Sequence, residues 1–228
     1  LAVVLFFSLP LWSQTSSPPK DEFSNPQAGK RGPRGIFFPL KIHGVKYALI
    51  TFLFYCGIET TVGLWGSSYL VRDRGLDAAA AAVWVSSYYG SITLGRLIAG
   101  FITFKINNKV LIRIGQGLIL TGVVLMLLPF SAGYALASFI LIGLGAAPIF
   151  PSMLHETPAR FGQEDAQHVM GFQMAAAYIG STFLPPIFGF IASNTNLALF
   201  PVFLLAFTAF MLASSERLNA ILTKNAAG

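Results

Sequence analysis

Charged residues are scarce in this chain. Only 11% of its 228 residues are Asp, Glu, Lys or Arg, whereas 54% are hydrophobic. Soluble domains carry about a quarter charged residues, so this composition cannot cover a surface that faces water. The hydrophobic residues also stand in long runs rather than at the spacing of strands or surface helices. We therefore expect a protein whose solvent is lipid.

Several signatures of soluble enzymes are missing as well. The single cysteine, Cys56, lies inside a hydrophobic run, which excludes a disulfide framework or a cysteine-based metal site within the chain. No Walker or Rossmann glycine motif is present, which argues against a nucleotide-driven pump. His43, His155 and His168 lie near the ends of the runs, so an intramembrane serine nucleophile would lack its histidine partner. We expect neither enzymatic activity nor a bound cofactor or metal.

The chain does have six apolar runs that are long enough to cross a bilayer. A hydrocarbon core of about 30 Å needs about 20 helical residues. Barrel strands would be about half as long and would alternate apolar with polar residues, which these runs do not. The predicted fold class is therefore an all-α membrane protein with a bundle of six transmembrane helices. The predicted spans are Lys46–Val71, Ala78–Phe104, Val110–Phe130, Tyr134–Leu154, Val169–Ser193 and Leu197–Ser214.

The remaining segments complete the predicted domain organisation. Residues 1–12 are apolar but too short to span, and we expect them to be the end of an earlier transmembrane helix. Residues 13–44 are rich in polar residues, Pro and Gly, which is typical of a flexible linker. Residues 45–215 are the predicted six-helix bundle, and residues 216–228 a cytoplasmic tail. An N-terminal membrane-embedded half is expected before this sequence.

The basic residues are distributed unevenly between the two ends of the predicted spans. If the linker is cytoplasmic, thirteen Lys and Arg residues fall on the cytoplasmic side, and only Arg72 and Arg74 on the other. This bias is the positive-inside pattern of membrane proteins. It explains the net charge of +6 without a nucleic-acid partner. We expect a multi-pass protein of the inner cell membrane, surrounded by lipid, with both ends of the six-helix block in the cytoplasm.

Glu59 is the most informative polar residue, because it lies near the middle of the first span. A carboxylate at that depth costs roughly 2.5–3.5 kcal/mol on insertion scales, so it is expected to face a cavity or a neighbouring helix. At about 100° per residue, Tyr55, Gly63 and Gly66 share its face. Glu59 and Tyr55 are therefore predicted to bind substrate or a proton. The alternative is a protonated Glu59 that holds two helices together.

Other polar side chains within the spans are further candidates for substrate binding. Trp65 lies on the first span, where its indole suits either stacking on a sugar ring or the interfacial aromatic belt. Ser87 and Tyr88 lie on one face of the second span, which suits either a polyol or close helix packing. Gln173, on the fifth span, is expected either to face substrate or to bond across helices. The sequence leaves these alternatives open.

Three stretches carry a family resemblance. The first span reads Tyr55-x-Gly57-x-Glu59-x-x-x-Gly63-x-Trp65-x-x-x-Tyr69-Leu70. The second stretch is Gly95-Arg96-x-x-x-Gly100 with Lys105 and Asn107-Asn108-Lys109, and the third comprises Gly143–Pro151 and Glu156–Gly162. They resemble helix seven, the loop motif between helices eight and nine, and helix ten of the major facilitator superfamily, in the branch of fucose permease and related hexose symporters. The resemblance covers nearly the whole chain.

The resemblance implies a transporter of twelve helices in two six-helix bundles, with the substrate held between them and alternating access by rocking. This chain would supply the end of helix six, the central loop and helices seven to twelve. Arg96, Lys105 and Lys109 would form a gating loop by pairing with acids, although residues 104–109 contain no acid. The proton-coupling carboxylates known in that branch lie largely in the missing half.

These inferences predict secondary active transport of a small polar solute, with a sugar as the first expectation, by proton symport. The expected partners are the solute, H⁺, membrane lipid and the N-terminal six-helix half. One alternative is a drug or metabolite exporter that works by proton antiport. Another is a membrane sensor that kept the fold without transporting, and a membrane-embedded enzyme is the least favoured class.

Overall fold

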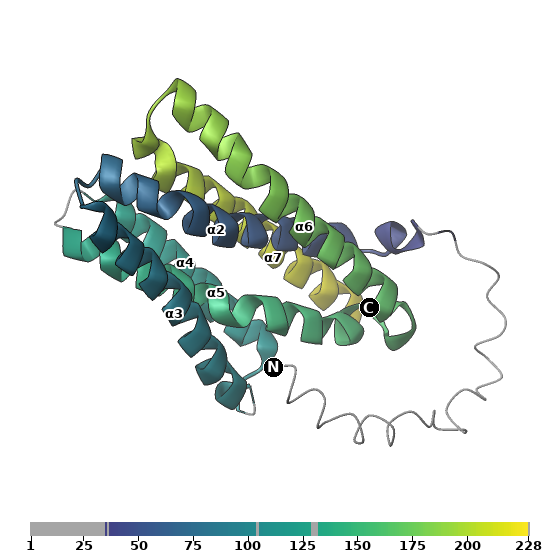
Figure 1. Cartoon of the computed structure of the whole chain (residues 1–228). Helices are drawn as coiled ribbons and strands as arrows, with labels where there is room; N and C mark the ends of the chain where they lie inside the picture. The colour runs from purple at the N-terminus through teal and green to yellow at the C-terminus, as the bar shows by residue number, and fades with distance from the viewer. Residues whose placement is uncertain (1–34, 36, 104, 129–131, 228) are drawn as a thin grey trace, which may run out of the picture. The chain divides into compact units, whose positions relative to one another are not determined.

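Six long helices make up most of the computed structural model (Figure 1). It describes residue 35 and residues 37–103, 105–128 and 132–227, and no strand occurs among them. The predicted helix end at residues 1–12, and the linker up to residue 34, lie outside the described residues. The long helices are α2 (Val45–Arg72), α3 (Ala78–Ile102), α4 (Asn108–Leu127), α5 (Ala132–Phe161), α6 (Gln163–Asn194) and α7 (Phe200–Ala227), with short 3₁₀ helices η2 (Phe38–Lys41) and η3 (Leu197–Leu199).

Short turns connect the long helices, so consecutive helices run antiparallel (Figure 1). Asp77 begins α3 by accepting two backbone N–H groups of its first turn, at 2.9 and 3.0 Å. Asn107 begins α4 by accepting the backbone N–H of Lys109 at 2.9 Å. Both side chains satisfy donors that the first helical turn leaves unpaired. Gly162 separates α5 from α6 with φ 90°, a value that residues with a Cβ rarely adopt.

Five of the described helices are long and apolar enough to cross a membrane. They are α2, α4 and α6 over their full lengths, α5 from Gly133 to Phe161, and the segment Leu197–Lys224 that contains α7. The predicted all-α membrane fold is therefore confirmed. Among the six long helices, α3 falls short of this criterion. It is long enough, with 25 residues, but carries a run of Ser, Tyr and Thr hydroxyls and one arginine.

Three helices extend well beyond the predicted spans. α5 continues past Leu154 to Phe161, α6 begins at Gln163 and not at Val169, and α7 continues past Ser214 to Ala227. The predicted spans ended where hydropathy falls, whereas backbone hydrogen bonding continues through polar residues outside an apolar core. Leu218 is buried in a small cluster with residues of α2, α5 and α6. The first part of the segment predicted as a tail therefore packs on the bundle.

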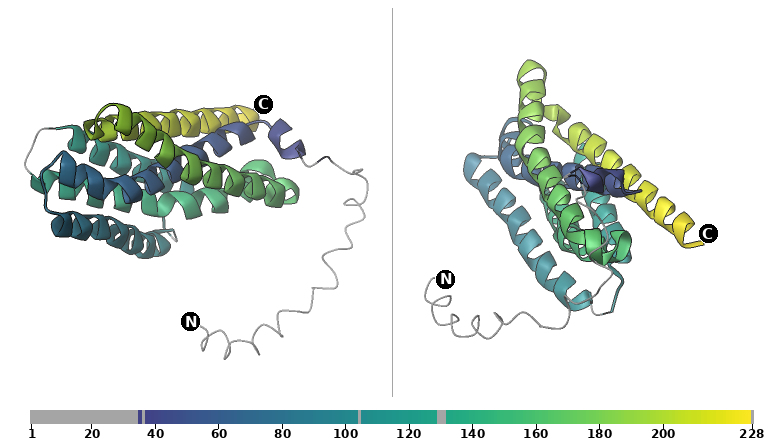
Figure 2. Two further views of the ribbon diagram at one scale, coloured as in Figure 1. Left: turned by 45° about the horizontal axis from the view of Figure 1, so that its top comes forward. Right: turned by 90° about the vertical axis from the view of Figure 1, so that its right-hand side faces the viewer.

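α2 and α5 occupy the inner positions of the bundle. α2 contacts α6 and α7 along much of its length, and α5 contacts α4 and α3 in the same way. α2 and α5 touch each other over only a short stretch. α3 lies at one edge of the bundle in both views of Figure 2. The largest buried side chains include Tyr55, Tyr88, Phe139 and Phe188, which fill the space between these helices.

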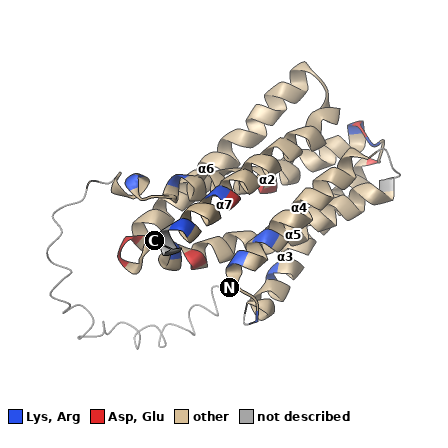
Figure 3. Cartoon of the chain, turned by 180° about the vertical axis from the view of Figure 1, so that it is seen from behind, with Lys and Arg blue, Asp and Glu red and all other residues tan. Residues whose placement is uncertain are grey.

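The charged residues lie mainly at the two ends of the bundle. At the end where α3 joins α4, here called the basic end, are Lys105, Lys109 and Arg113. The opposite end, where α2 joins α3, carries Arg72, Asp73 and other charged residues. Figure 3 shows Lys and Arg gathered toward the basic end, where α7 also finishes, and a mixed group of acids and bases opposite. The bundle thus has an apolar middle between two polar ends.

Candidate functional site

Glu59 lies in the middle of α2 and is held by a tyrosine one turn earlier. The hydroxyl of Tyr55 donates to Glu59 Oε2 at 2.5 Å. The same hydroxyl oxygen lies 3.0 Å from the backbone carbonyl oxygen of Ala146 on α5. Tyr55 is completely buried. Its single proton therefore has two acceptors within reach, a carboxyl oxygen on its own helix and a carbonyl oxygen on a neighbouring one.

Arg96 of α3 faces the other oxygen of the same carboxyl group. Its Nη2 lies 3.7 Å from Glu59 Oε1, which is close enough for an ion pair but too long for a hydrogen bond. The Glu59 side chain is 26% exposed and that of Arg96 is 52% exposed. Glu59 thus has one short hydrogen bond and one loose ion pair, whereas Arg96 has only the latter within the described part of the chain.

The Glu59 carboxyl group lines a cavity of about 330 Å³ that is formed by four helices, and this cavity is called the Glu59 cavity below. α2, α3, α5 and α6 all contribute to its wall. Its lining residues are Cys56, Glu59, Thr60, Arg96, Phe150, Pro151 and Ser181. The volume falls within the range of small-molecule sites.

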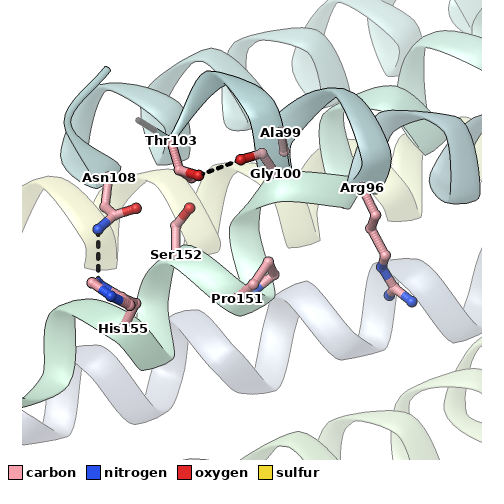
Figure 4. Close-up of a pocket in the computed structure, with 8 residues that line it drawn as sticks. All are labelled: Arg96, Ala99, Gly100, Thr103, Asn108, Pro151, Ser152 and His155. Carbon is pink, nitrogen blue, oxygen red and sulfur yellow. Dashed lines mark hydrogen bonds between the residues drawn. The ribbon is translucent and has the colours of Figure 1, made fainter. Parts of the chain in front are cut away.

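A second cavity, of about 510 Å³, continues from the first toward the basic end and is called the His155 cavity. The two cavities share Arg96 and Pro151 in their walls. In Figure 4 the Arg96 side chain extends from α3 away from the pair formed by Asn108 and His155. The Asn108 amide lies 3.1 Å from His155 Nδ1, and the hydroxyl of Ser152 points into the space between α3 and α5.

Tyr88 contacts the backbone of α2 at Glu59 and not its carboxyl group. Its hydroxyl donates to the backbone carbonyl of Glu59 at 3.1 Å, and its ring is buried. The ring packs edge-on against Phe139 of α5 and against Tyr89. Tyr88 therefore fixes the backbone of α2 at Glu59 and does not line either cavity. Its neighbour Ser87 donates to the carbonyl of Val83 at 3.0 Å, within its own helix, and also lies outside both linings.

Trp65 lies between α2 and α6, away from Glu59. Its indole N–H donates to the carbonyl of Pro185 at 3.0 Å, and its ring packs edge-on against Phe188 at 5.6 Å. A Cβ at Gly189 would clash with the indole, so this glycine provides the space in which the ring sits. The contacts of Trp65 are those of a helix-packing residue.

Gln173 bonds across helices. Its Oε1 accepts the hydroxyl of Thr157 on α5 at 2.9 Å, and both side chains are buried. The Thr157 oxygen also lies 3.0 Å from the carbonyl of Met153, one turn earlier. Of the two alternatives that the sequence left open, the geometry favours a hydrogen bond between helices, because Gln173 lines neither the Glu59 cavity nor the His155 cavity.

The two lysines predicted in a gating loop lie at the basic end, both exposed. Lys105 and Glu156 line a common cavity of about 370 Å³, and Glu156 makes an ion pair with Arg160 at 3.4 Å. Glu156 of α5 is thus the acid nearest to the loop that has none of its own. Lys109 lines a small cavity with Arg113 and residues of α7. A gating role for these lysines stays a prediction.

The structure therefore brings together Glu59, Tyr55, Tyr88 and Arg96, and it places Trp65, Ser87 and Gln173 elsewhere. The sequence analysis did not assign the carbonyl of Ala146, nor the residues Thr60, Ser152 and Asn108, to a site. A backbone carbonyl leaves no signal in a sequence, and the other three are ordinary polar residues at helix positions. Only their packing across α2, α4 and α5 identifies them.

The arrangement can hold a proton in either of two states. With Glu59 ionised, Tyr55 donates to the carboxylate. With Glu59 protonated, the carboxylic acid can donate to the Tyr55 oxygen, whose own proton then goes to Ala146. Every donor finds an acceptor in both states, as buried polar groups require. Around this group the cavity offers hydroxyl, thiol, aromatic and guanidinium surface to a solute.

Comparison with known proteins identifies the family of this chain. The family model of the Major Facilitator Superfamily matches residues 1–185 and residues 47–220. Bypass of stop codon protein 6 of Saccharomyces cerevisiae (strain ATCC 204508 / S288c) is 28% identical over 172 residues, which are 68% of this chain and 33% of that protein. The chain thus spans about a third of the length of this relative.

Solved structures show the same fold. The transporter FucP in its outward conformation matches with a TM-score of 0.66 and 13% identity, over 77% of this chain and 42% of that one. A variant of the Escherichia coli fucose:proton symporter FucP gives 0.67 and 16%, over 79% and 44%. A variant of the peptide transporter POT, in complex with alafosfalin, gives 0.71 and 18%, over 84% and 40%. At these identities the likeness concerns the fold alone. The chain is a multi-pass membrane protein that belongs to the Major Facilitator Superfamily.

Proposed function

We propose that this chain forms one half of a secondary transporter that moves a small polar solute, first of all a sugar, by proton symport with alternating access. The observation that carries the proposal is a carboxyl group in the middle of a transmembrane helix, bonded to Tyr55 and lining a cavity of about 330 Å³. Ionisable groups at the depth of the membrane core have a high free-energy cost of insertion, and they typically mark substrate, ion or proton pathways. Glu59 is the proposed proton site.

The bonding of Tyr55 supports reversible protonation at Glu59. Its hydroxyl lies 2.5 Å from Glu59 Oε2 and 3.0 Å from the Ala146 carbonyl oxygen, so its proton can turn from one to the other when the carboxyl group gains or loses a proton. The wall of the same cavity provides Thr60 and Ser181 hydroxyls for the polar edge of a solute and the Phe150 ring for its apolar face.

The remaining half of the solute path is proposed to come from an N-terminal six-helix bundle. The solved relatives are more than twice as long as the part matched here, which supports this division. We place the basic end in the cytoplasm of a cell whose inner membrane holds the protein, with residues 13–44 as the cytoplasmic linker, because the basic residues gather at that end. Arg96, Lys105 and Lys109 lie toward that end as the proposed gate.

Transport by the full-length protein in proteoliposomes tests the proposal. Labelled galactose and fucose should accumulate when the interior is made alkaline. Glu59→Gln should abolish this accumulation while exchange of labelled for unlabelled sugar continues, because a neutral amide can bind solute but cannot carry a proton. Glu164→Gln, an exposed acid in the first turn of α6, is the matched control and should accumulate sugar normally.

Two results would contradict the proposal separately. If Glu59→Gln accumulates sugar as the unchanged protein does, the proton site lies elsewhere. If neither sugar is accumulated or exchanged by the unchanged protein, the solute is not a neutral hexose of this kind.

A further inference from the structure

Arg96 is the cationic side chain that both cavities share. It lines the Glu59 cavity and the His155 cavity, and among the residues of the two linings only Arg96 and Glu59 carry a fixed charge at neutral pH. Arg96 extends from α3 across the space toward α2 (Figure 4). Its position between the two cavities places it in the path of a solute that passes from one to the other.

The guanidinium group of Arg96 has fewer partners than its number of hydrogen-bond donors allows. It offers five N–H donors in a planar fork. Its one charged partner among the described residues is Glu59 Oε1, at 3.7 Å, and none of its donors forms a hydrogen bond within the described part of the chain. The side chain is half exposed toward the cavities. The ligand that satisfies the most of these donors at once is a planar oxyanion that accepts two parallel hydrogen bonds.

Glu59 cannot form an ion pair with Arg96 in every state of the proposed transport cycle. Its other oxygen, Oε2, is already held by Tyr55 at 2.5 Å. In the proton-loaded state of the proposed transport cycle Glu59 is neutral, so the walls that the described residues supply carry the positive charge of Arg96 with no acid of their own beside it. Closing this half of the site around a neutral solute would then bury a charge that the described part of the chain leaves unpaired, which is strongly unfavourable away from water. An anionic solute would neutralise that charge.

The hydrogen-bonding groups next to Arg96 also suit an anion. The hydroxyl of Ser152 points into the His155 cavity, and this residue is 3% exposed. No described residue accepts or donates a hydrogen bond at this hydroxyl, so it is available to a ligand. Thr60 and Ser181 offer two more hydroxyls in the Glu59 cavity. The described residues of the two cavity walls thus offer hydroxyl groups and, apart from Glu59, no Asp or Glu.

We propose that the transported solute carries a carboxylate, which Arg96 binds through two parallel hydrogen bonds while the hydroxyl groups around it bind the rest of the molecule. This inference rests on the proposed function and narrows its substrate class from polar sugars in general to acidic sugars. The binding step forms no covalent bond. The solute carboxylate replaces Glu59 beside Arg96, and one proton on Glu59 accompanies one anion.

The test uses full-length protein in proteoliposomes with galacturonate and galactose as probes. The two sugars differ in one carboxylate, so the ratio of their strengths as competitors isolates the contribution of the charge. The unchanged protein should accumulate labelled galacturonate under an inward proton gradient, and unlabelled galacturonate should compete at least about a hundredfold more strongly than galactose, the lower end of the range expected for a pair of charge-assisted hydrogen bonds. Pentanoate serves as a third probe, because it has a carboxylate and no hydroxyl groups.

Two variants separate charge from shape at Arg96. Arg96→Gln should bring the galacturonate and galactose competition to about the same level, and Arg96→Lys, which keeps the charge but loses the fork, should retain only part of the preference. Thermal unfolding of both variants checks that they fold. The ratio of the two competitors within one variant remains meaningful even if the amount of folded protein falls.

Each outcome decides a different point. Accumulation of galactose with no accumulation of, or competition by, galacturonate overturns the anion proposal and leaves the proposed function standing. Competition by pentanoate as strong as that by galacturonate supports anion binding and overturns the assignment to sugars. A preference for galacturonate that survives Arg96→Gln overturns the role of Arg96. If none of the three probes binds, both the anion proposal and the sugar proposal fail.

Discussion

The hydrogen bond between Thr157 and Gln173 provides a quantitative test of the role of a buried amide. Thr157→Val removes the hydroxyl and keeps the shape, and so leaves Gln173 Oε1 without the donor that lies 2.9 Å away in the structure. Gln173→Leu removes the acceptor instead, but Thr157 can still donate to the carbonyl of Met153 at 3.0 Å. The two single changes are therefore unequal, and Thr157→Val should cost more.

The expected magnitude follows from the burial of the pair. A buried acceptor left unpaired costs about 1–3 kcal/mol in soluble proteins, whereas hydrogen bonds between transmembrane helices average about 0.6 kcal/mol and reach about 1.7 kcal/mol in double-mutant cycles. We expect a coupling free energy of about 0.6–1.7 kcal/mol between the two sites, measured as free energies of unfolding in mixed detergent micelles. The double variant should be more stable than the sum of the single changes implies.

A matched control lies in α7. Thr208 is also buried and donates to the carbonyl of Leu204 at 2.8 Å, a bond within its own helix. Thr208→Val should therefore cost less than Thr157→Val, because no second helix loses a partner. A coupling free energy indistinguishable from zero would refute the reasoning. So would a fall in solute affinity that Gln173→Leu and the double variant share and Thr157→Val does not, since that would place the amide at the solute.

Three further predictions concern the packing of the bundle. A Cβ at Gly180 would collide with the backbone of Leu53, so Gly180→Ala should lower the melting temperature, whereas Gly171→Ala in the same helix meets no atom within 4 Å and should leave it unchanged or raise it. Arg74 donates to the Tyr69 hydroxyl at 2.9 Å and to the Met126 carbonyl at 2.6 Å, so Arg74→Gln should destabilise the protein, while the exposed Arg72→Gln should not. The Arg113–Glu216 pair is bidentate at 2.8 Å but exposed, so Glu216→Gln should cost at most about 1 kcal/mol, and the difference should vanish at about 1 M salt.

The sequence predicts the helices of this protein better than their contacts. Long apolar runs are a direct consequence of a lipid environment, and they located all six long helices to within a few residues at most ends. The last turns of α5 and α7 and the first turns of α6 were missed, because polar residues end a hydropathy run without ending a helix. The polar stripe of α3 lowers its hydropathy, although its length and its Ala-rich start identify it as a helix.

The sequence predicted the candidate site only in part. Glu59 and Tyr55 are four residues apart on one helix, so helical periodicity alone predicts that they meet. The approach of Arg96 depends on how α3 crosses α2, which no periodicity within one helix records. For the same reason, the sequence left two roles open for Trp65 and two for Gln173. Their hydrogen-bond partners, Pro185 and Thr157, lie on other helices.

The position of the cavity follows from where the helices approach each other closely. Gly115 of α4 and Gly145 of α5 are so close that a Cβ on either would meet the backbone of the other, and Gly180 of α6 comes as close to Leu53 of α2. These contacts make α4 with α5, and α2 with α6, two tightly packed pairs. α2 and α5 themselves touch only briefly, so the space between the pairs is the place where polar groups can lie without interrupting a packed interface. The hydrogen bond from Tyr55 to Ala146 crosses this space, and under the proposed function the charge of Glu59 would decide whether the Tyr55 hydroxyl donates to Glu59 on α2 or to Ala146 on α5. A change of protonation would then act at the boundary between the two closely packed pairs, where a small rearrangement disturbs the least packing.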